Sequence, residues 1–173
     1  YNTGVGLAAL DAITTGDNNT ALGYNSLSAN TTGTGNVAYG YNTLAANTTA
    51  DQNLAIGYNA LAAQTSDGGY NTAVGNYTLD DNSTGDRNVG IGYNSLTANT
   101  TGYYNTSTGV NSLKLNTTGN LNVAMGETSL GANTSGDQNV AIGTYSLTSN
   151  TTASGNTAVG TYASYYNTTG NSN

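Results

Sequence analysis

The chain has 173 residues, 24 of them glycine, and it contains no proline, cysteine, histidine or tryptophan. Only 6% of the residues are charged, against about 25% in ordinary soluble domains, and the apolar residues are mostly small, so a wide core of large side chains is excluded. The net charge of −7, with Arg87 and Lys114 as the only cations, argues against binding to nucleic acid or to an anionic membrane surface.

The missing residue types also exclude most catalytic chemistry. Without histidine or cysteine there is no conventional nucleophile–base pair and no zinc site of the usual kind. No stretch approaches the ~20 apolar residues that span a bilayer. We therefore expect no enzyme, no cofactor and no membrane insertion.

Three columns of like residues recur along the chain with a spacing of 17, broken once by 18. The asparagines are Asn2, Asn19, Asn36, Asn53, Asn71, Asn88, Asn105, Asn122, Asn139, Asn156 and Asn173. The glycines are Gly6, Gly23, Gly40, Gly57, Gly75, Gly92, Gly109, Gly126, Gly143 and Gly160. The leucines are Leu10, Leu27, Leu44, Leu61, Leu79, Leu96, Leu113, Leu130 and Leu147, with Ser164 in the last turn. Such self-similarity marks a repeat architecture. It predicts one all-β domain over residues 1–173, a parallel β-solenoid of ten 17-residue turns.

Numbered from the asparagine, the turn reads N-V/T-A-I/V-G-Y-N-S-L-x-A-N-T-T-G-D-Q. Positions 1 to 5 place large residues at 2 and 4 and small ones at 3 and 5, as in Val37, Ala38 and Tyr39, which is the period of a strand. Positions 8 to 12 also alternate, with Leu27 at position 9 and Ala29 at position 11, and we predict a second strand there.

Positions 13 to 17 are rich in residues that favour turns, and they predict a loop outside the ladder. The one extra residue falls in this loop, at Gly68 and Gly69, so both strands are expected to stay in register. A helix is excluded, because glycine and threonine are poor helix formers and the glycine column interrupts every 3.6-residue stripe.

The asparagine and glycine columns are interpreted as structural. In a parallel stack the asparagine side chains lie about 4.8 Å apart and can hydrogen-bond to one another. The glycines are expected to end the first strand with a positive φ or a close backbone approach. A phosphate-cradling role lacks the lysine that such loops carry.

Small residues occupy position 3 (Gly, Ala or Ser) and position 8 (Ala, Ser or Thr) of every turn, which suggests a flattened coil with a narrow lumen. If they line the lumen, the large residues of positions 2 and 4 point outwards and need cover from other chains, most simply in a trimer about the fibre axis. The opposite parity places the large residues inside a single-chain solenoid. The sequence leaves both open, and we favour the first.

All fourteen aromatic residues are tyrosine, and several recur at position 6. These are Tyr24, Tyr41, Tyr58 and Tyr93. Such a column can stack on itself or contact sugars through ring faces and hydroxyls. Self-stacking is the simpler interpretation, and glycan contact is the alternative.

Three further patterns suggest weaker candidates. Asp80 and Asp81 are the only adjacent carboxylates, and they suit a solvated turn better than weak calcium binding. Eleven N-x-S/T sequons occur, mostly at position 12, where glycans would coat an exposed rod, although Asn-Thr-Thr is also good turn chemistry. The threonines of positions 13 and 14 suggest the hypothesis of an ice-binding face. Adjacent residues of an extended chain point to opposite sides, which counts against this hypothesis.

The repeat resembles two known kinds of array. The run N-V-A-I-G at residues 139–143 with Ser146-Leu147, and N-L-A-I-G at residues 53–57 with Ala60-Leu61, resemble the head repeat of YadA-like trimeric autotransporter adhesins. Residues 19–27, N-T-A-L-G-Y-N-S-L, followed by N-T-T-G at residues 30–33, are similar to the repeat arrays of predicted phage tail-fibre proteins.

The resemblance implies a left-handed parallel β-roll, commonly trimeric, that attaches to host surfaces or matrix from an extracellular, cell-surface or virion location. We therefore expect a structural rod segment of a virion or cell-surface fibre, serving in attachment or as a spacer, with copies of itself as partners. The alternatives are a self-polymerising extracellular filament of rods joined end to end, and a glycan-binding surface that uses the tyrosines on host sugars. Because the chain begins at Tyr1 and stops within the repeat at Asn173, we expect a piece of a longer fibre protein.

Overall fold

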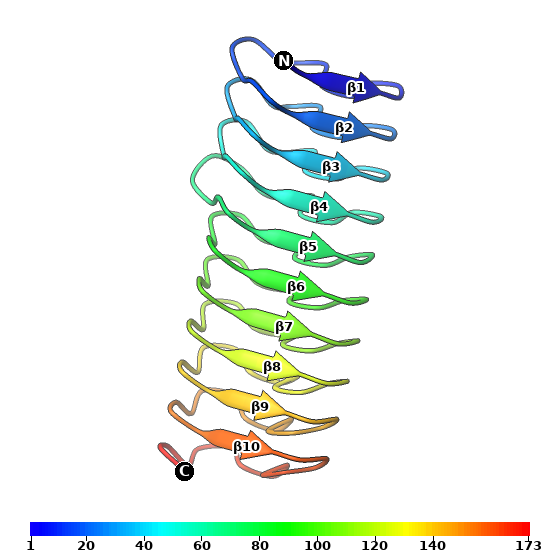
Figure 1. Ribbon diagram of the computed structural model, residues 1–173. Helices are drawn as coiled ribbons and strands as arrows, with labels where there is room; N and C mark the ends of the chain where they lie inside the picture. The colour runs from blue at the N-terminus through cyan, green and yellow to red at the C-terminus, as the bar shows by residue number, and fades with distance from the viewer.

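The computed structural model describes residues 1–173 and consists of ten short strands joined by turns. The strands are β1 (Thr3–Val5), β2 (Thr20–Leu22), β3 (Val37–Tyr39), β4 (Leu54–Ile56), β5 (Thr72–Val74), β6 (Val89–Ile91), β7 (Thr106–Thr108), β8 (Val123–Met125), β9 (Val140–Ile142) and β10 (Thr157–Val159). They pair in parallel and in chain order in one sheet. Figure 1 shows the stack, with the two termini at opposite ends and each turn as one flattened coil. The predicted parallel β-solenoid is confirmed.

Each strand covers positions 2 to 4, inside the predicted range of positions 1 to 5. Equivalent residues face each other in neighbouring turns, so that Val37 pairs with Leu54 and Ala38 with Ala55. The strand ends because the glycine of position 5 adopts a φ between 125° and 138°, which leaves the β region.

The predicted second strand at positions 8 to 12 is wrong. Leu27 at position 9 has a φ of 50° and Asn25 at position 7 a φ of 57°. This segment, which we call the return arm of the turn, therefore has residues in the left-handed region and curls instead of extending. The return arm still forms backbone hydrogen bonds between neighbouring turns, which we call rungs. Leu27 N–H donates to Thr43 O at 3.0 Å and Ala29 N–H to Ala45 O at 3.2 Å. Of the 107 backbone hydrogen bonds, only 18 join strand residues to one another and the other 89 involve turns, so the turns contribute most of the backbone hydrogen bonds of the stack.

The single insertion leaves the strands in register, as predicted, since Leu54 pairs with Thr72 across it. A second change accompanies it in the same turn: Gln64 stands at position 12, where neighbouring turns have asparagine. Its Nε2 donates to Gly68 O, four residues ahead, whereas Asn82 Nδ2 donates to Gly85 O, three residues ahead, at 2.9 Å. One extra methylene in the side chain thus compensates for one extra residue in the loop.

The lumen holds a single file of leucine and alanine flanked by amides. Leu27 and Ala38, at positions 9 and 3, are completely buried, as are their equivalents from Leu44 to Leu147 and from Ala55 to Ala141. Hydroxyls of position 8 bond across this narrow space, as when Ser112 Oγ donates to Ala124 O at 3.2 Å. The small residues therefore line the lumen, and the large residues of positions 2 and 4 face outwards.

Candidate functional site

The asparagines of position 1 form a continuous internal ladder. The Oδ1 of Asn36 accepts from Asn53 N at 2.9 Å and from Asn53 Nδ2 at 3.2 Å, and the Nδ2 of Asn36 donates to Ala50 O at 2.9 Å. From Asn19 to Asn156 these side chains are at most 2% exposed. A ladder with every amide group engaged holds the turns together and offers no group to a ligand.

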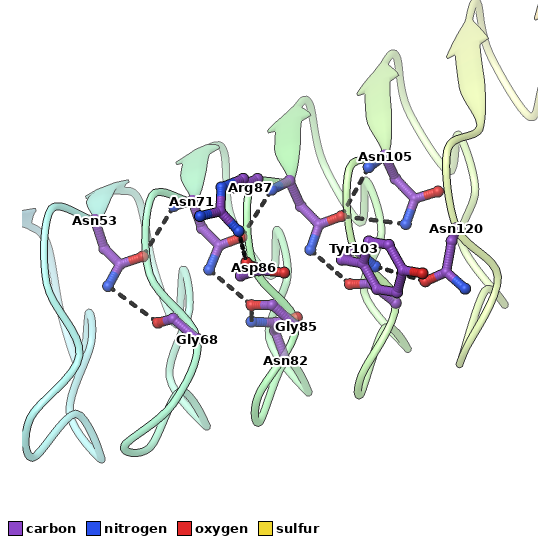
Figure 2. Close-up of polar contacts among 12 residues, drawn as sticks. Asn53, Gly68, Asn71, Asn82, Gly85, Asp86, Arg87, Tyr103, Asn105 and Asn120 are labelled. Atoms are coloured by element: carbon purple, nitrogen blue, oxygen red, sulfur yellow. Dashed lines mark hydrogen bonds and ion pairs between the residues drawn. The ribbon is translucent and has the colours of Figure 1, made fainter.

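A second amide ladder, which the sequence analysis did not recognise, runs through position 12. Asn116 Nδ2 donates to Asn99 Oδ1 at 2.8 Å and to Gly119 O at 3.0 Å, and Asn105 of the first ladder also donates to Gly119 O at 2.8 Å. Figure 2 shows the same convergence of Asn71 and Asn82 on Gly85. The recurrence of asparagine at position 12 was the available signal.

Burial of the second ladder determines whether most of the sequons can carry a glycan. The position-12 residues from Asn30 to Asn150 are completely buried, so their amide nitrogens face the lumen and are hydrogen-bonded there. Two acceptors of this ladder, Asn47 Oδ1 and Asn150 Oδ1, have no partner. In both places the ladder is interrupted, because the position-12 side chain of the next turn does not donate to this acceptor. That side chain is Gln64 in the longer turn and Asn167 in the last turn. The folded solenoid has no room for a glycan on these asparagines.

The glycines of position 5 are required by the distance between turns. A Cβ added to Gly109, whose φ is 138°, would lie 2.5 Å from Gly126 O of the next turn. Backbone atoms at that distance cannot move aside without breaking the rung. These glycines serve the close approach of successive turns.

A third ladder, at position 16, is partly exposed and includes acidic side chains. Asp137 Oδ1 accepts from Asn120 N at 2.7 Å, and Asn120 Oδ1 accepts from Tyr103 N at 2.9 Å, which Figure 2 draws. Part of the negative charge of the chain therefore caps backbone N–H groups of the loop.

The outer face of the sheet is uncharged and mostly apolar, with threonine at position 2 of five strands and at both outward positions of β7. Large side chains of position 4 stand on it with substantial exposure, including Leu22 at 48%, Ile91 at 41% and Met125 at 43%. No strand contains a charged residue, although the chain carries nine carboxylates and two cations. With a rise of ~4.8 Å per strand, ten strands make this face about 48 Å long.

The tyrosines of position 6 stack on one another. The rings of Tyr24 and Tyr41 lie 5.1 Å apart and those of Tyr41 and Tyr58 lie 5.0 Å apart, with interplanar angles of 15° and 5°. The column continues through Tyr77, at position 7, which meets Tyr93 edge-on at 6.0 Å. Because the stacked rings cover each other's faces, a sugar could reach only their edges and hydroxyls.

A separate cluster, missed from the sequence, surrounds Arg87 at position 17. The guanidinium carbon of Arg87 lies 5.3 Å from the ring centroids of both Tyr70 and Tyr104, and its Nη1 pairs with Asp86, as Figure 2 shows for the ion pair. The edge of Tyr103 packs against Tyr104 at 5.7 Å. These residues are far apart in sequence and share only their place at the end of successive turns.

The remaining candidates offer little to a ligand. Burial, and then the charge of Asp81, raises the pKa of Asp80 from 3.8 to about 6, but no third metal-ligating side chain joins the pair. The threonines of positions 13 and 14 lie in a turn, where Thr31 is half-buried and Thr32 exposed. The chain encloses no pocket, and it contains no helix of the length and hydropathy needed to cross a membrane.

Comparisons with protein families, with curated proteins and with solved structures found no match to this chain. The geometry of the solenoid therefore carries the functional argument alone.

Proposed function

We propose that the chain is a structural rod segment of a virion or cell-surface fibre, in which it serves for attachment or as a spacer and works as a homo-oligomer. The chains pack through the outer faces of their sheets, most simply as a trimer of left-handed coils about the fibre axis. The observation that carries this proposal is the face along all ten strands, which is uncharged throughout and carries a large apolar residue or tyrosine at position 4 of every strand except β7.

The size and chemistry of this face favour burial against like chains. It is about 48 Å long, and the two outward residues of each strand make it roughly 7 Å wide before side chains are counted. A mostly apolar strip of several hundred Å² is at the upper end of what soluble monomers expose. On a chain with a net charge of −7, charges are found at the corners and on the return arm, and the sheet face lacks them.

The interior suits a long, uniform rod. Each turn from the second to the ninth repeats two buried amide ladders, a buried leucine at position 9 and a glycine in contact with the next turn, so stability accumulates from one turn to the next. The stacked tyrosines do not carry the proposal, because their faces are used within the column. We expect no catalytic role for such a rod.

The test is the mass of the folded chain in solution. Light scattering or sedimentation should give a multiple of the 17.4 kDa protomer mass. Ile91→Lys places a charge on the face and should dissociate the oligomer into folded monomers, because an unpaired buried charge costs several kcal/mol.

Thr101→Lys adds the same charge at an exposed corner and is the matched control, which should leave the mass unchanged. A folded monomer for the unsubstituted chain would contradict the proposed function.

A further inference from the structure

The two edges of the sheet face carry aromatic and cationic side chains at the same height. We call the residues at positions 6 and 7, just after each strand, the trailing edge, and those at position 17, just before each strand, the leading edge. Strand β6 has Arg87 on its leading side and Tyr93 on its trailing side, and β5 lies between Tyr70 and Tyr77.

This coincidence is confined to the middle of the rod. On the leading edge Tyr70, Arg87 and Tyr104 form one stack, with the guanidinium between the two rings. Elsewhere that edge carries neither aromatic nor charged side chains apart from the terminal residue, its members being Asn18, Gly35, Gln52, Leu121, Gln138, Gly155 and Ser172. The stack is well exposed, since Tyr70 is 53% and Tyr104 is 49% accessible.

The symmetry of an assembly decides which edges meet. If rods pack in parallel with their sheet faces towards a common axis, the trailing edge of one copy meets the leading edge of the next at the same height, whether two or three copies surround the axis. If two rods pack antiparallel about a perpendicular two-fold axis, trailing edge meets trailing edge. The distribution of residues therefore distinguishes these arrangements.

We infer that the chains assemble in parallel and in register, with Tyr77 and Tyr93 of one copy contacting the Tyr70–Arg87–Tyr104 stack of the next. This inference rests on the proposed function, since it requires an oligomer. It specifies the direction and alignment of the chains and the contact that sets them.

The chemistry of the two edges is complementary. A guanidinium has five N–H donors, and Arg87 uses Nη1 on Asp86, so donors remain at its outer rim for tyrosine hydroxyl oxygens. Tyr93 is 49% exposed and Tyr77 half-buried, so their ring edges and hydroxyls are available. Tyrosine and arginine are the residues enriched at protein interfaces. Closed rotational symmetry about the rod axis keeps the copies in register, and this pairing supplies one such contact per interface.

Cysteine cross-linking tests this pairing cleanly, because the chain has no cysteine of its own. Arg87→Cys and Tyr93→Cys are combined in one chain, and light scattering first establishes the oligomer. Within one chain these positions lie on either side of β6, six residues and roughly 15–20 Å apart, so a bismaleimide shorter than that separation can join them only between copies.

The double variant should give covalent species up to the full mass of the oligomer, while each single variant should give none. An intact oligomer that does not cross-link would overturn the inference, and so would cross-linking of Tyr93→Cys alone, which indicates antiparallel rods. A monomer by light scattering would instead remove the proposed function itself, and the inference with it.

A double-substitution cycle gives an independent measurement. Arg87→Ala and Tyr93→Ala should each raise the dissociation constant of the oligomer roughly tenfold, and the double variant should lose little more than either alone. Residues this far apart within one chain normally show additive effects, so additive losses would count against contact between copies.

Discussion

Replacement of one asparagine in the middle of the position-1 ladder should destabilise the rod far more than an ordinary polar substitution. Asn105 is completely buried, and its Oδ1 is the acceptor for the backbone N–H of Asn122 at 3.0 Å. Asn105→Ala leaves that N–H buried in the stack without a partner, which costs about 1–3 kcal/mol.

Three further hydrogen bonds disappear with the side chain: those from Asn105 Nδ2 to Asn88 Oδ1 and Gly119 O, and that from Asn122 Nδ2 to Asn105 Oδ1. The groups left behind each keep another hydrogen bond, so each loss is taken near the lower limit of about 0.5 kcal/mol. The sum is a decrease of about 2.5–4.5 kcal/mol in the free energy of unfolding.

Two readouts follow this change. Urea unfolding monitored by circular dichroism gives the total, and native-state hydrogen exchange should show lost protection at the Asn122 amide specifically. Thr101→Ala, at an exposed position in the neighbouring turn, is the control and should stay within about 0.5 kcal/mol of the unsubstituted chain.

Asn105→Asp separates the roles of donor and acceptor. The aspartate keeps an acceptor for the Asn122 amide, but it places a second oxygen against Gly119 O and Asn88 Oδ1, where the Nδ2 donor stood. Its carboxylate should destabilise at pH 7 at least as much as alanine, because an unpaired buried charge is costly. Unchanged stability of this variant, or an Asn122 amide that stays protected in Asn105→Ala, would refute the ladder as the source of cohesion.

Three further substitutions probe other parts of the turn. Gly109→Ala brings a Cβ to 2.5 Å from Gly126 O and should cost about 3 kcal/mol or more in urea unfolding, whereas Gly35→Ala, whose nearest contact is 3.4 Å, should cost only about 1 kcal/mol. Leu96→Ile, normally a mild exchange, should cost about 3 kcal/mol, because a β-branched side chain is strained at a φ of 53°; a cost below 1 kcal/mol would contradict this. Since the pKa of Asp80 is raised to about 6, its ionisation opposes folding, so the melting temperature should rise as the pH falls from 7 to 4. The shift corresponds to roughly 3 kcal/mol at full strength, reduced by solvent screening to about 1 kcal/mol, and Asp80→Asn should gain this at pH 7 and lose the pH dependence.

Much of the architecture follows from the sequence because a 17-residue repeat imposes the same environment on every turn. Once Ala38 and Ala55 occupy equivalent places, parallel pairing aligns them, and the number of turns, the first strand and the tolerated insertion at Gly68 and Gly69 follow. The sequence also limited the packing to two alternatives, with either the small residues of position 3 or the large residues of positions 2 and 4 inside. Residues on either side of position 3 must point away from it.

Only the tertiary structure decided those features for which the sequence allows more than one conformation. The alternation of Leu27 and Ala29 is compatible with a strand and equally with a curled segment that contains residues in the left-handed region. Only the hydrogen bonds to the next turn select the curled segment. The parity, the inward direction of Asn116, and the pairing of Gln64 with the longer loop depend on where the lumen lies. The stack of Tyr70, Arg87 and Tyr104 depends on the rise between turns. Side-chain direction in a turn is set by backbone dihedrals that close the coil, and these are determined by contacts between turns rather than by the residues of one turn.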